Sequence, residues 1–268
     1  MRRGGFALLA VLWTLVAVTA LGSVAIATAR LGGLTTRNRV LLGRAAWARE
    51  ACAEMVLGSA GRRTLRRLDS VDLGRGTWCD ATLEDPSTKL NLNVADRAAL
   101  AAVLRAVAPA WAVDSLVDGL VAWRRRAGGV AALAALAAVP GFDDSLIARL
   151  GALVTTRGTG AINVNAAPPV VLATLPGMTE EALELVLARR GDAPLTGADA
   201  LAALLTPGAR TTLLGSYPEF VRAVAFAPPQ LIAIVRGGVR GTSLVARVTL
   251  TLAPVAGRLA VLRRETEE

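Results

Sequence analysis

The chain begins with a long run of apolar residues. No charged side chain occurs from Gly4 to Ala29, and the segment Phe6–Ala29 is predominantly hydrophobic. As a helix rising about 1.5 Å per residue, this segment would extend about 36 Å, which is enough to cross a bilayer. Arg2 and Arg3 precede it, which favours a cytoplasmic amino terminus and an extracytoplasmic remainder.

A cleaved secretory signal peptide is the alternative interpretation of this run. The small residues Ala27-Thr28-Ala29 are typical of a signal-peptidase site. However, the apolar core of a signal peptide usually has only about 7–15 residues. This run is longer, and no proline interrupts the chain between Met1 and Asp85. We therefore expect a retained transmembrane helix over residues 6–29.

Beyond the membrane segment, hydrophobic residues recur at spacings of three, four and seven. Such spacing places them on one face of a helix, which predicts that the same helix continues through residue 68. The residues of this stripe are Leu31, Leu34, Leu41, Ala45, Ala48, Cys52 and Met55. One long helix, apolar in its first half and amphipathic in its second, accounts for the pattern.

The rest of the chain divides into a helical middle and a β-rich carboxyl end. Loose alternation over Gly76–Asp85 predicts a strand. A helix over Leu116–Arg126 follows, which ends in three arginines and two glycines. After Pro218, Pro and Gly pairs separate short apolar runs that predict strands over Phe220–Phe226, Leu231–Arg236, Leu244–Leu252 and Arg258–Leu262. We expect these strands to form an antiparallel sheet on the N-terminal helix, with Gly237-Gly238 as one of the breaks.

The middle of the chain contains an internal repeat. Residues 90–100 read LNLNVADRAAL and residues 162–172 read INVNAAPPVVL, which aligns Asn91 with Asn163 and Asn93 with Asn165. Repetition of this kind predicts two copies of one supersecondary unit. Alternating apolar and Asn residues suit a short extended segment whose amides bond nearby backbone before a helix starts. We interpret the asparagines as structural, because no partner base accompanies them.

A second repeat resembles a motif that is found in DNA-binding proteins. Val139–Phe142 and Leu175–Met178 read VPGF and LPGM, and each is followed by acidic residues, as in helix-hairpin-helix turns. Such turns often hold a DNA phosphate, so the alternative function is a membrane-anchored DNA-binding protein of a competence system. Asp143 and Thr179 occupy the place of a second glycine, and the carboxylates oppose an anion. Nucleic acid is therefore the less favoured partner.

Composition restricts the chemistry more than it indicates a partner. The 268 residues are 53% hydrophobic and 19% charged, carry a formal net charge of +9, and include no histidine. Lys89 is the single lysine, and we interpret the arginines as dispersed rather than as a recognition surface. Without histidine, the commonest general base and metal ligand is missing, and no nucleophile–base pair is visible. We expect no enzymatic activity and assign no catalytic residue, metal site or cofactor.

Cys52 and Cys79 are the only cysteines of the chain. They are too few for a zinc ribbon and too far apart for a CxxC redox motif. They are either buried thiols or a disulfide that ties the N-terminal helix to the following strand. The spacing leaves both interpretations open.

The amino terminus resembles that of a known family. Arg2-Arg3-Gly4-Gly5 followed by Phe6-Ala7-Leu8-Leu9 is similar to the prepilin-peptidase site of type IV pilins and type II secretion pseudopilins. The resemblance implies cleavage after Gly5 and methylation of Phe6 as the new amino terminus. Most of these proteins carry a glutamate at the fifth mature position, where this chain has Ala10. That departure resembles the K-type minor pseudopilins, which are understood to sit at the filament tip.

The middle of the chain strengthens this resemblance. Residues 139–178, with the LNLN and INVNAAPPVVLATLPG segments, are similar to the pair of SAM-like helical modules inserted in K-type pseudopilins. The resemblance implies an α+β fold: a type IV pilin-like helix packed on a small antiparallel sheet, with an all-α insert of two SAM-like or helix-hairpin-helix modules. The implied organisation is a leader (1–5), a transmembrane helix (6–29), the periplasmic part of that helix (30–68), a first strand region (69–90), two helical modules (91–160 and 161–216) and a C-terminal β region (217–268).

The resemblance also implies a function and a location. K-type pseudopilins are inner-membrane, single-pass proteins with a periplasmic domain that cap the pseudopilus tip and help start its assembly for protein export. Implied partners are the I-, J- and H-type minor pseudopilins, the major pseudopilin, the inner-membrane assembly platform and the prepilin peptidase. Family members can carry calcium, but no carboxylate cluster of this sequence matches such a site.

Overall fold

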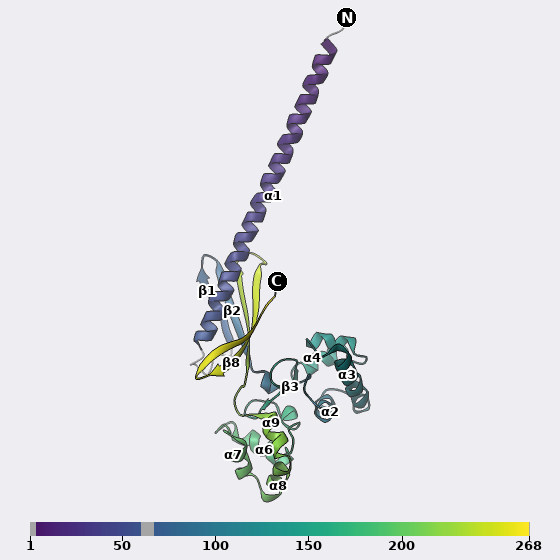
Figure 1. The fold of residues 1–268 in the computed structure, drawn as a ribbon, viewed down its shortest axis with the longest axis vertical. Helices are drawn as coiled ribbons and strands as arrows, with labels where there is room; N and C mark the ends of the chain where they lie inside the picture. Colours follow the sequence, from purple (N-terminus) through teal and green to yellow (C-terminus); the bar gives the residue numbers. More distant parts are fainter. Residues whose placement is uncertain (1–3, 60–66, 268) are drawn as a thin grey trace.

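The computed structural model describes residues 4–59 and 67–267. A long amino-terminal helix projects beyond a small antiparallel sheet, and a group of short helices lies at the opposite end of that sheet (Figure 1). This arrangement confirms the predicted α+β class, in which a pilin-like helix packs on a sheet and further helices are inserted.

Helix α1 runs over Gly4–Gly58 and is followed by β1, which begins at Arg67. Residues with good helix propensity and the lack of proline explain its length. The helix ends earlier than the predicted limit at residue 68. Glycine at position 58 is a poor helix former, and the Ser59 N–H closes the end by donating to the carbonyl oxygens of Met55 and Val56, at 3.0 and 3.2 Å.

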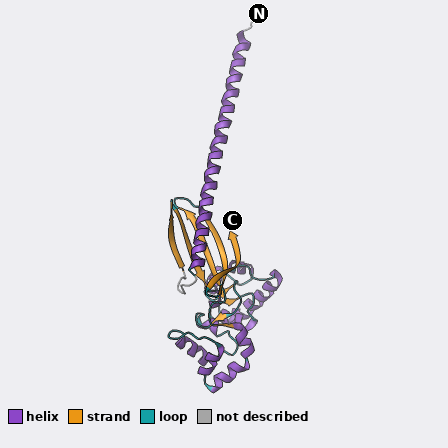
Figure 2. Ribbon diagram, turned by 60° about the vertical axis from the view of Figure 1, so that its left-hand side comes forward, coloured by secondary structure: helices purple, strands orange, loops and turns teal. Residues whose placement is uncertain are grey.

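Five antiparallel strands form the sheet against which α1 packs, in the order β1-β2-β7-β8-β9. The strands are β1 (Arg67–Gly74), β2 (Thr77–Glu84), β7 (Leu231–Val239), β8 (Val245–Val255) and β9 (Arg258–Glu267). Figure 2 shows α1 lying against one face of this sheet. All the helical modules are inserted between the neighbouring strands β2 and β7.

Strand β7 corrects the prediction that Gly237-Gly238 ends a strand, because both glycines lie inside it. A Cβ at Gly237 would come within 2.2 Å of the Arg49 amide nitrogen and 2.6 Å of the Ala45 carbonyl oxygen, both on α1. A Cβ at Gly238 would come within 2.7 Å of the Trp78 indole ring on the other face. The glycines therefore permit close approach of neighbouring groups and do not mark a turn.

The insert contains two modules that each begin and end with a two-residue parallel pairing. The first consists of β3 (Leu90–Asn91), α2 (Arg97–Arg105), α3 (Val113–Ala127), α4 (Asp144–Leu150) and β4 (Val154–Thr155), with β3 pairing with β4. The second consists of β5 (Ile162–Asn163), α5 (Pro169–Leu172), α6 (Glu180–Arg189), α7 (Ala198–Leu204), α8 (Pro207–Gly215), α9 (Tyr217–Ala223) and β6 (Val224–Ala225), with β5 pairing with β6.

Helix α9 corrects the prediction of a strand over Phe220–Phe226. Pro218 lies in the first turn of α9, where proline is tolerated, and Phe220 is fully buried in the core of the insert. The second module therefore extends to β6, and the sheet resumes only at Leu231, not at residue 217. A short apolar run does not distinguish a buried helix from a strand, which explains the error.

Candidate functional site

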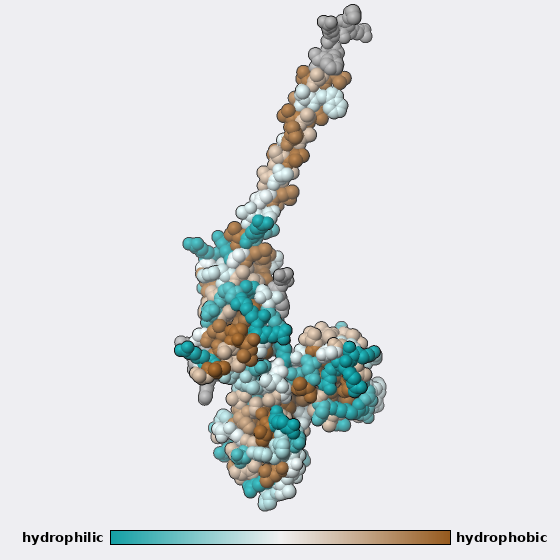
Figure 3. Space-filling model, in the orientation of Figure 1, coloured by the Kyte–Doolittle hydropathy of each residue, from teal (hydrophilic) through white to brown (hydrophobic). Residues whose placement is uncertain are grey.

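The amino-terminal part of α1 lacks contact with the rest of the described chain. All residues from Leu9 to Val40 are exposed, and their large hydrophobic side chains retain between 49% (Val16) and 71% (Leu21) of their accessible surface. Figure 3 shows this projecting, largely hydrophobic segment. In the described ranges α1 alone is long and apolar enough to cross a membrane, with a mean hydropathy of 2.2 in its best window. Such a surface is typical of a helix that contacts lipid or partner helices, which makes α1 a candidate membrane span.

The predicted processing residues lie at the start of this helix. Gly5 and Phe6 fall within α1, but their side chains, like residues 1–3 of the predicted leader, are outside what the structure describes. Ala10 is exposed on the projecting part of the helix. Cleavage after Gly5, methylation of Phe6 and the filament role of Ala10 remain predictions.

The second half of α1 packs on the sheet through part of the predicted stripe. Ala45, Ala48 and Cys52 are fully buried there, and Val56 continues the same face. Met55 is 36% exposed because spacings of three, four and four lead to Val56 instead. The first members of the predicted stripe, Leu31 and Leu34, are exposed because they lie beyond the reach of the sheet.

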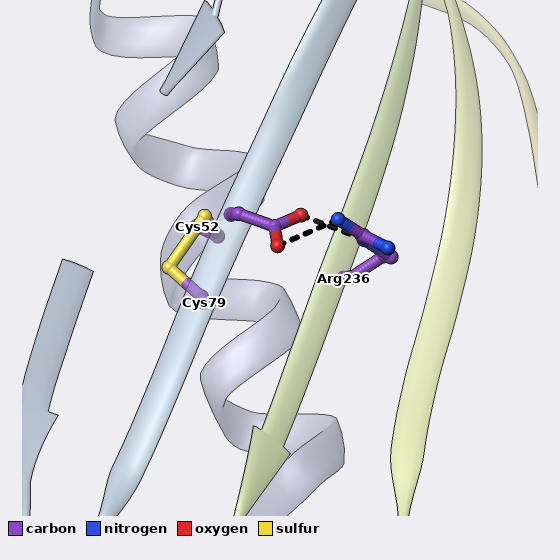
Figure 4. Close-up of a disulfide and its surroundings, with 4 residues drawn as sticks. Cys52, Cys79 and Arg236 are labelled. Carbon is purple, nitrogen blue, oxygen red and sulfur yellow. Dashed lines mark hydrogen bonds and ion pairs between the residues drawn. A yellow bond between two sulfur atoms is a disulfide. The ribbon is translucent and has the colours of Figure 1, made fainter. Parts of the chain in front are cut away.

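A disulfide joins α1 to β2 at the point of closest packing. Cys52 and Cys79 are bonded, with their Cα atoms 5.9 Å apart, and both are fully buried (Figure 4). Cys79 lies opposite Gly237 in the sheet register, so the bond is adjacent to the contact between the α1 and β7 backbones. On the outer face, Asp80 accepts two hydrogen bonds from Arg236 at 2.8 and 2.9 Å, which joins β2 to β7.

Charged groups fix the edge of α1 to the last strand. Glu50 accepts hydrogen bonds from Arg49, at 2.6 Å, and from Arg264 of β9. Burial would raise the pKa of Glu50, but the hydrogen bonds from Arg264 and Arg49 outweigh it and hold that pKa below its ordinary value. The carboxylate is therefore ionised at neutral pH and links helix and strand.

The repeated asparagines close each module by bonding to distant backbone. In the first module, Asn91 donates to the carbonyl oxygens of Arg157 and Gly158 at 3.1 and 3.0 Å. Asn93 accepts from the Val130 N–H at 2.6 Å and donates to the carbonyl oxygens of Val130 and Thr156. These bonds support the structural interpretation of the asparagines. The repeated pattern in the sequence does not reveal which backbone groups they bind.

The second module repeats this arrangement. Asn165 accepts from the Leu195 N–H at 2.9 Å and donates to the carbonyl oxygens of Leu195 and Phe226. Asn163 donates instead to the Asp85 carboxylate at 3.0 Å, in the link between β2 and the first module. The second module is therefore also attached to the segment that enters the insert.

The hairpin-like turns are capped by side chains of the chain itself. Asp143 accepts a hydrogen bond from the Leu146 N–H at 2.7 Å, and Thr179 accepts one from the Ala182 N–H at 3.2 Å. Hydrogen bonds from Leu146 and from the Ser145 hydroxyl hold the pKa of Asp143 below its ordinary value. A carboxylate that is ionised at this helix start competes with any phosphate, which disfavours the DNA-binding alternative.

The described residues contain no cluster of side chains suited to a metal ion. Within residues 4–59 and 67–267, no group of three His, Cys, Asp or Glu side chains could hold a metal ion. An open groove of about 800 Å³ separates the first module from β9 and is lined by arginines, among them Arg125 and Arg157. Its carboxylate, Glu265, already pairs with Arg263 at 2.8 Å and with Arg157 at 3.8 Å.

Comparisons with known proteins identify a fold but no family. No protein-family profile and no curated protein sequence matches the chain. It is similar to a chain in the crystal structure of the GspK-GspI-GspJ complex from the type II secretion system of enterotoxigenic Escherichia coli, with a TM-score of 0.60 and 15% sequence identity. The similarity covers 87% of this chain and 99% of that chain. The fold is therefore pseudopilin-like.

Proposed function

We propose that this chain is a minor pseudopilin of a type II secretion system, anchored in the inner membrane by Phe6–Ala29 with its sheet and insert in the periplasm. The observation that carries the proposal is the division of α1. Residues 9–40 are exposed and largely apolar, whereas the segment from Ala45 to Val56 packs on the sheet. Such a helix suits lipid before assembly and the helices of other subunits afterwards. The pseudopilin-like fold supports this proposal.

Among the minor pseudopilins, we propose that this chain is a K-type subunit, which caps the tip of the pseudopilus and helps start its assembly. Ala10 provides no carboxylate to pair with a subunit above it. The insert forms a bulky body beyond the sheet, at the end opposite to the projecting helix (Figure 1). The I- and J-type subunits are the proposed partners, since the similar structure is a complex of GspK with GspI and GspJ. A buried disulfide suits the oxidising periplasm.

Mass spectrometry of the protein purified from membranes tests the processing step. We expect a mature chain that begins with methylated Phe6, and Gly5→Leu should block cleavage because it enlarges the residue before the scissile bond. Gly22→Leu, far from the junction, is the matched control and should leave processing unchanged. A chain that begins after Ala29 would show a cleaved signal peptide and contradict the proposal.

Co-purification tests the place in the filament. The full-length chain, co-expressed with I- and J-type pseudopilins, should be recovered with both in detergent. Ala10→Glu should leave this complex intact and should relieve the block to addition of subunits above it, which is measured as longer pseudopili. Recovery of neither partner, or tight and steeply salt-dependent binding of duplex DNA by the same preparation, would contradict the assignment.

A further inference from the structure

The positive charge of the chain is concentrated near its amino terminus. Residues 1–66 contain ten arginines and two glutamates, so they carry +8 of the formal +9. The arginines themselves are dispersed, as expected, and the local excess arises because acidic residues are scarce in this segment. Four of them, Arg30, Arg37, Arg39 and Arg44, lie on α1 between the apolar run and the part of the helix that packs on the sheet. The first acidic residue of the chain is Glu50.

These four arginines have no partner within the described part of the chain. Each is exposed, and none takes part in an ion pair or a side-chain hydrogen bond with another described residue. The nearest carboxylate along the helix, Glu50, is already bound by Arg49 and Arg264. The apolar side chains of Leu31 and Leu34, which are 64% and 58% exposed, lie between the first arginines. Exposed leucines beside unpaired arginines suit the boundary between hydrocarbon and headgroups.

The position of the arginines along α1 matches one layer of a membrane. Arg30 directly follows Ala29, the last residue of the apolar run. Arg37 and Arg39 lie about 11 and 14 Å further along a helix axis. Helical side chains tilt toward the amino terminus, so the guanidinium groups of Arg37 and Arg39 reach back by several ångströms, whereas that of Arg30 must extend toward the carboxyl end to stay out of the hydrocarbon. The headgroup layer on one side of a bilayer is about 5–8 Å thick, so these groups lie in it or at its surface.

Arg44 differs from the other three in depth. Its Cα lies about 21 Å beyond that of Arg30, so even with the same backward reach its guanidinium group stays outside the headgroup layer, by about one Debye length of 8–10 Å at physiological ionic strength. Arg30 and Arg37 are seven residues apart and share one side of the helix, whereas Arg39 lies on the opposite side. Arg30, Arg37 and Arg39, here named the arginine collar, therefore surround the helix at one level.

We propose that the arginine collar binds the phosphate groups of anionic phospholipids in the leaflet at the carboxyl end of the apolar run. The proposal rests on the membrane anchoring of the proposed function and adds a ligand to it. Guanidinium groups bind phosphate in a bidentate manner, and several on one helix favour lipids with a net negative charge over zwitterionic ones. The collar thereby sets the depth of α1 and holds the subunit in the membrane until the filament takes it up.

The test measures which lipid the full-length chain prefers. The protein is reconstituted in phosphatidylcholine vesicles that contain a trace of spin-labelled phosphatidylglycerol or spin-labelled phosphatidylcholine. Electron paramagnetic resonance then gives the fraction of each label whose motion is restricted at the protein surface. At about 0.15 M salt, where the Debye length is about 8 Å, we expect phosphatidylglycerol to be preferred by about two- to fivefold, since each basic residue near the surface contributes at most about fivefold. The preference should decrease as salt is added.

Variants separate the collar from the charge of the helix in general. Arg30→Gln, Arg37→Gln and Arg39→Gln combined should reduce the preference to about onefold, and circular dichroism should show unchanged helix content because these side chains contact no other described element. Arg44→Gln is the matched control and should retain the preference of the native chain. An equal loss with Arg44→Gln would overturn the assignment of the collar to the headgroup layer.

The remaining outcomes distinguish the two proposals from each other. Restricted lipid with no preference in the native chain, or a preference that survives in the triple variant, would overturn the collar and leave the membrane anchor intact. A complete lack of restricted lipid would show that α1 does not enter the bilayer. That result would overturn the proposed anchoring, and the collar with it.

Discussion

Small side chains make up a larger share of the core between α1 and the sheet than of the core of the insert. Of the ten buried residues in the first core, three are alanine and two are cysteine, and the other five are valines and leucines such as Val56 and Leu252. The second contains many leucines together with Phe142 and Phe220. Small residues let the backbones of α1 and β7 touch, and a disulfide then fixes them in place. In the insert, asparagine side chains connect distant segments of backbone.

This comparison predicts that the two cores fail independently and for different reasons. Adding volume should damage the first core, and removing a polar clamp should damage the second. Hydrogen exchange of the full-length chain in detergent micelles, resolved by mass spectrometry of peptides, reports on both cores in one experiment.

Gly237→Val should have the largest effect. The new side chain would collide with the backbone of α1 at Arg49 and Ala45, so the helix must move away from the sheet. We expect the free energy of opening measured by hydrogen exchange in β7 and β8 to fall by more than about 3 kcal/mol, which is the upper end of the usual cost of overpacking. Gly208→Ala in α8, where an added Cβ meets no atom within 4 Å, is the control and should change little. Unchanged protection in β7 would refute the close contact.

Removal of the disulfide should rank second. Cys52 and Cys79 are 27 residues apart, and a loop of that size stabilises a fold by about 3.5 kcal/mol in the chain-entropy account. The double variant Cys52→Ala, Cys79→Ala should lower the free energy of opening of the sheet by this amount and leave that of the insert unchanged. Reduction of the native chain by dithiothreitol should reproduce the effect. An equal loss in the insert would show that the cores are coupled.

Asn91→Ala should weaken the first module alone. Asn91 is 3% exposed, and its loss leaves the carbonyl oxygens of Arg157 and Gly158 and the amide of Asn93 without their side-chain partner. An unsatisfied buried polar group costs about 1–3 kcal/mol. We therefore expect the free energy of opening measured by hydrogen exchange in α2 and α3 to fall by about 2 kcal/mol. Asn38→Ala, on the exposed part of α1, is the control. Equal losses in both modules would contradict a local clamp.

Glu50→Gln should have the smallest effect, and one that depends on pH. Because the folded pKa of Glu50 lies below its unfolded value, its contribution is complete above the unfolded pKa and is lost as pH falls through the folded pKa. The side chain is 41% exposed, so we expect less than about 1 kcal/mol near pH 7. Urea unfolding at about pH 7 and pH 3 measures the difference from the native chain, which should vanish at the lower pH. A constant difference would exclude the ionised link to Arg264.

Sequence reasoning succeeded where a pattern is long and local. The charge-free run predicts the projecting part of α1, and the spacing of Ala45, Ala48 and Cys52 predicts the face that packs on the sheet. The asparagine repeat predicts two similar modules, and each pair of asparagines does bond to backbone. These features depend on periodicity or repetition, which neighbours in the sequence determine.

Predictions from the sequence were wrong where the conformation depends on a contact between residues far apart in the chain. Gly237 resembles a strand end in the sequence, yet it lies inside a strand because α1 crosses it. Phe220 belongs to a short apolar run that favours a strand, yet it fills the core of the insert from a helix. The limit of the stripe, at Val56 and not at Met55, depends on where the sheet meets the helix.

The sequence by itself determined the apolar run of α1, its charged boundary at Arg30, the duplication of the insert and the availability of two cysteines. These are properties of composition and spacing along one chain. Only the tertiary structure decided that Cys52 bonds to Cys79, that Gly237 receives the backbone of α1, and which backbone groups the asparagines bind. Each of these depends on residues far apart in the sequence, whose meeting is set by the packing of whole elements and not by any local pattern.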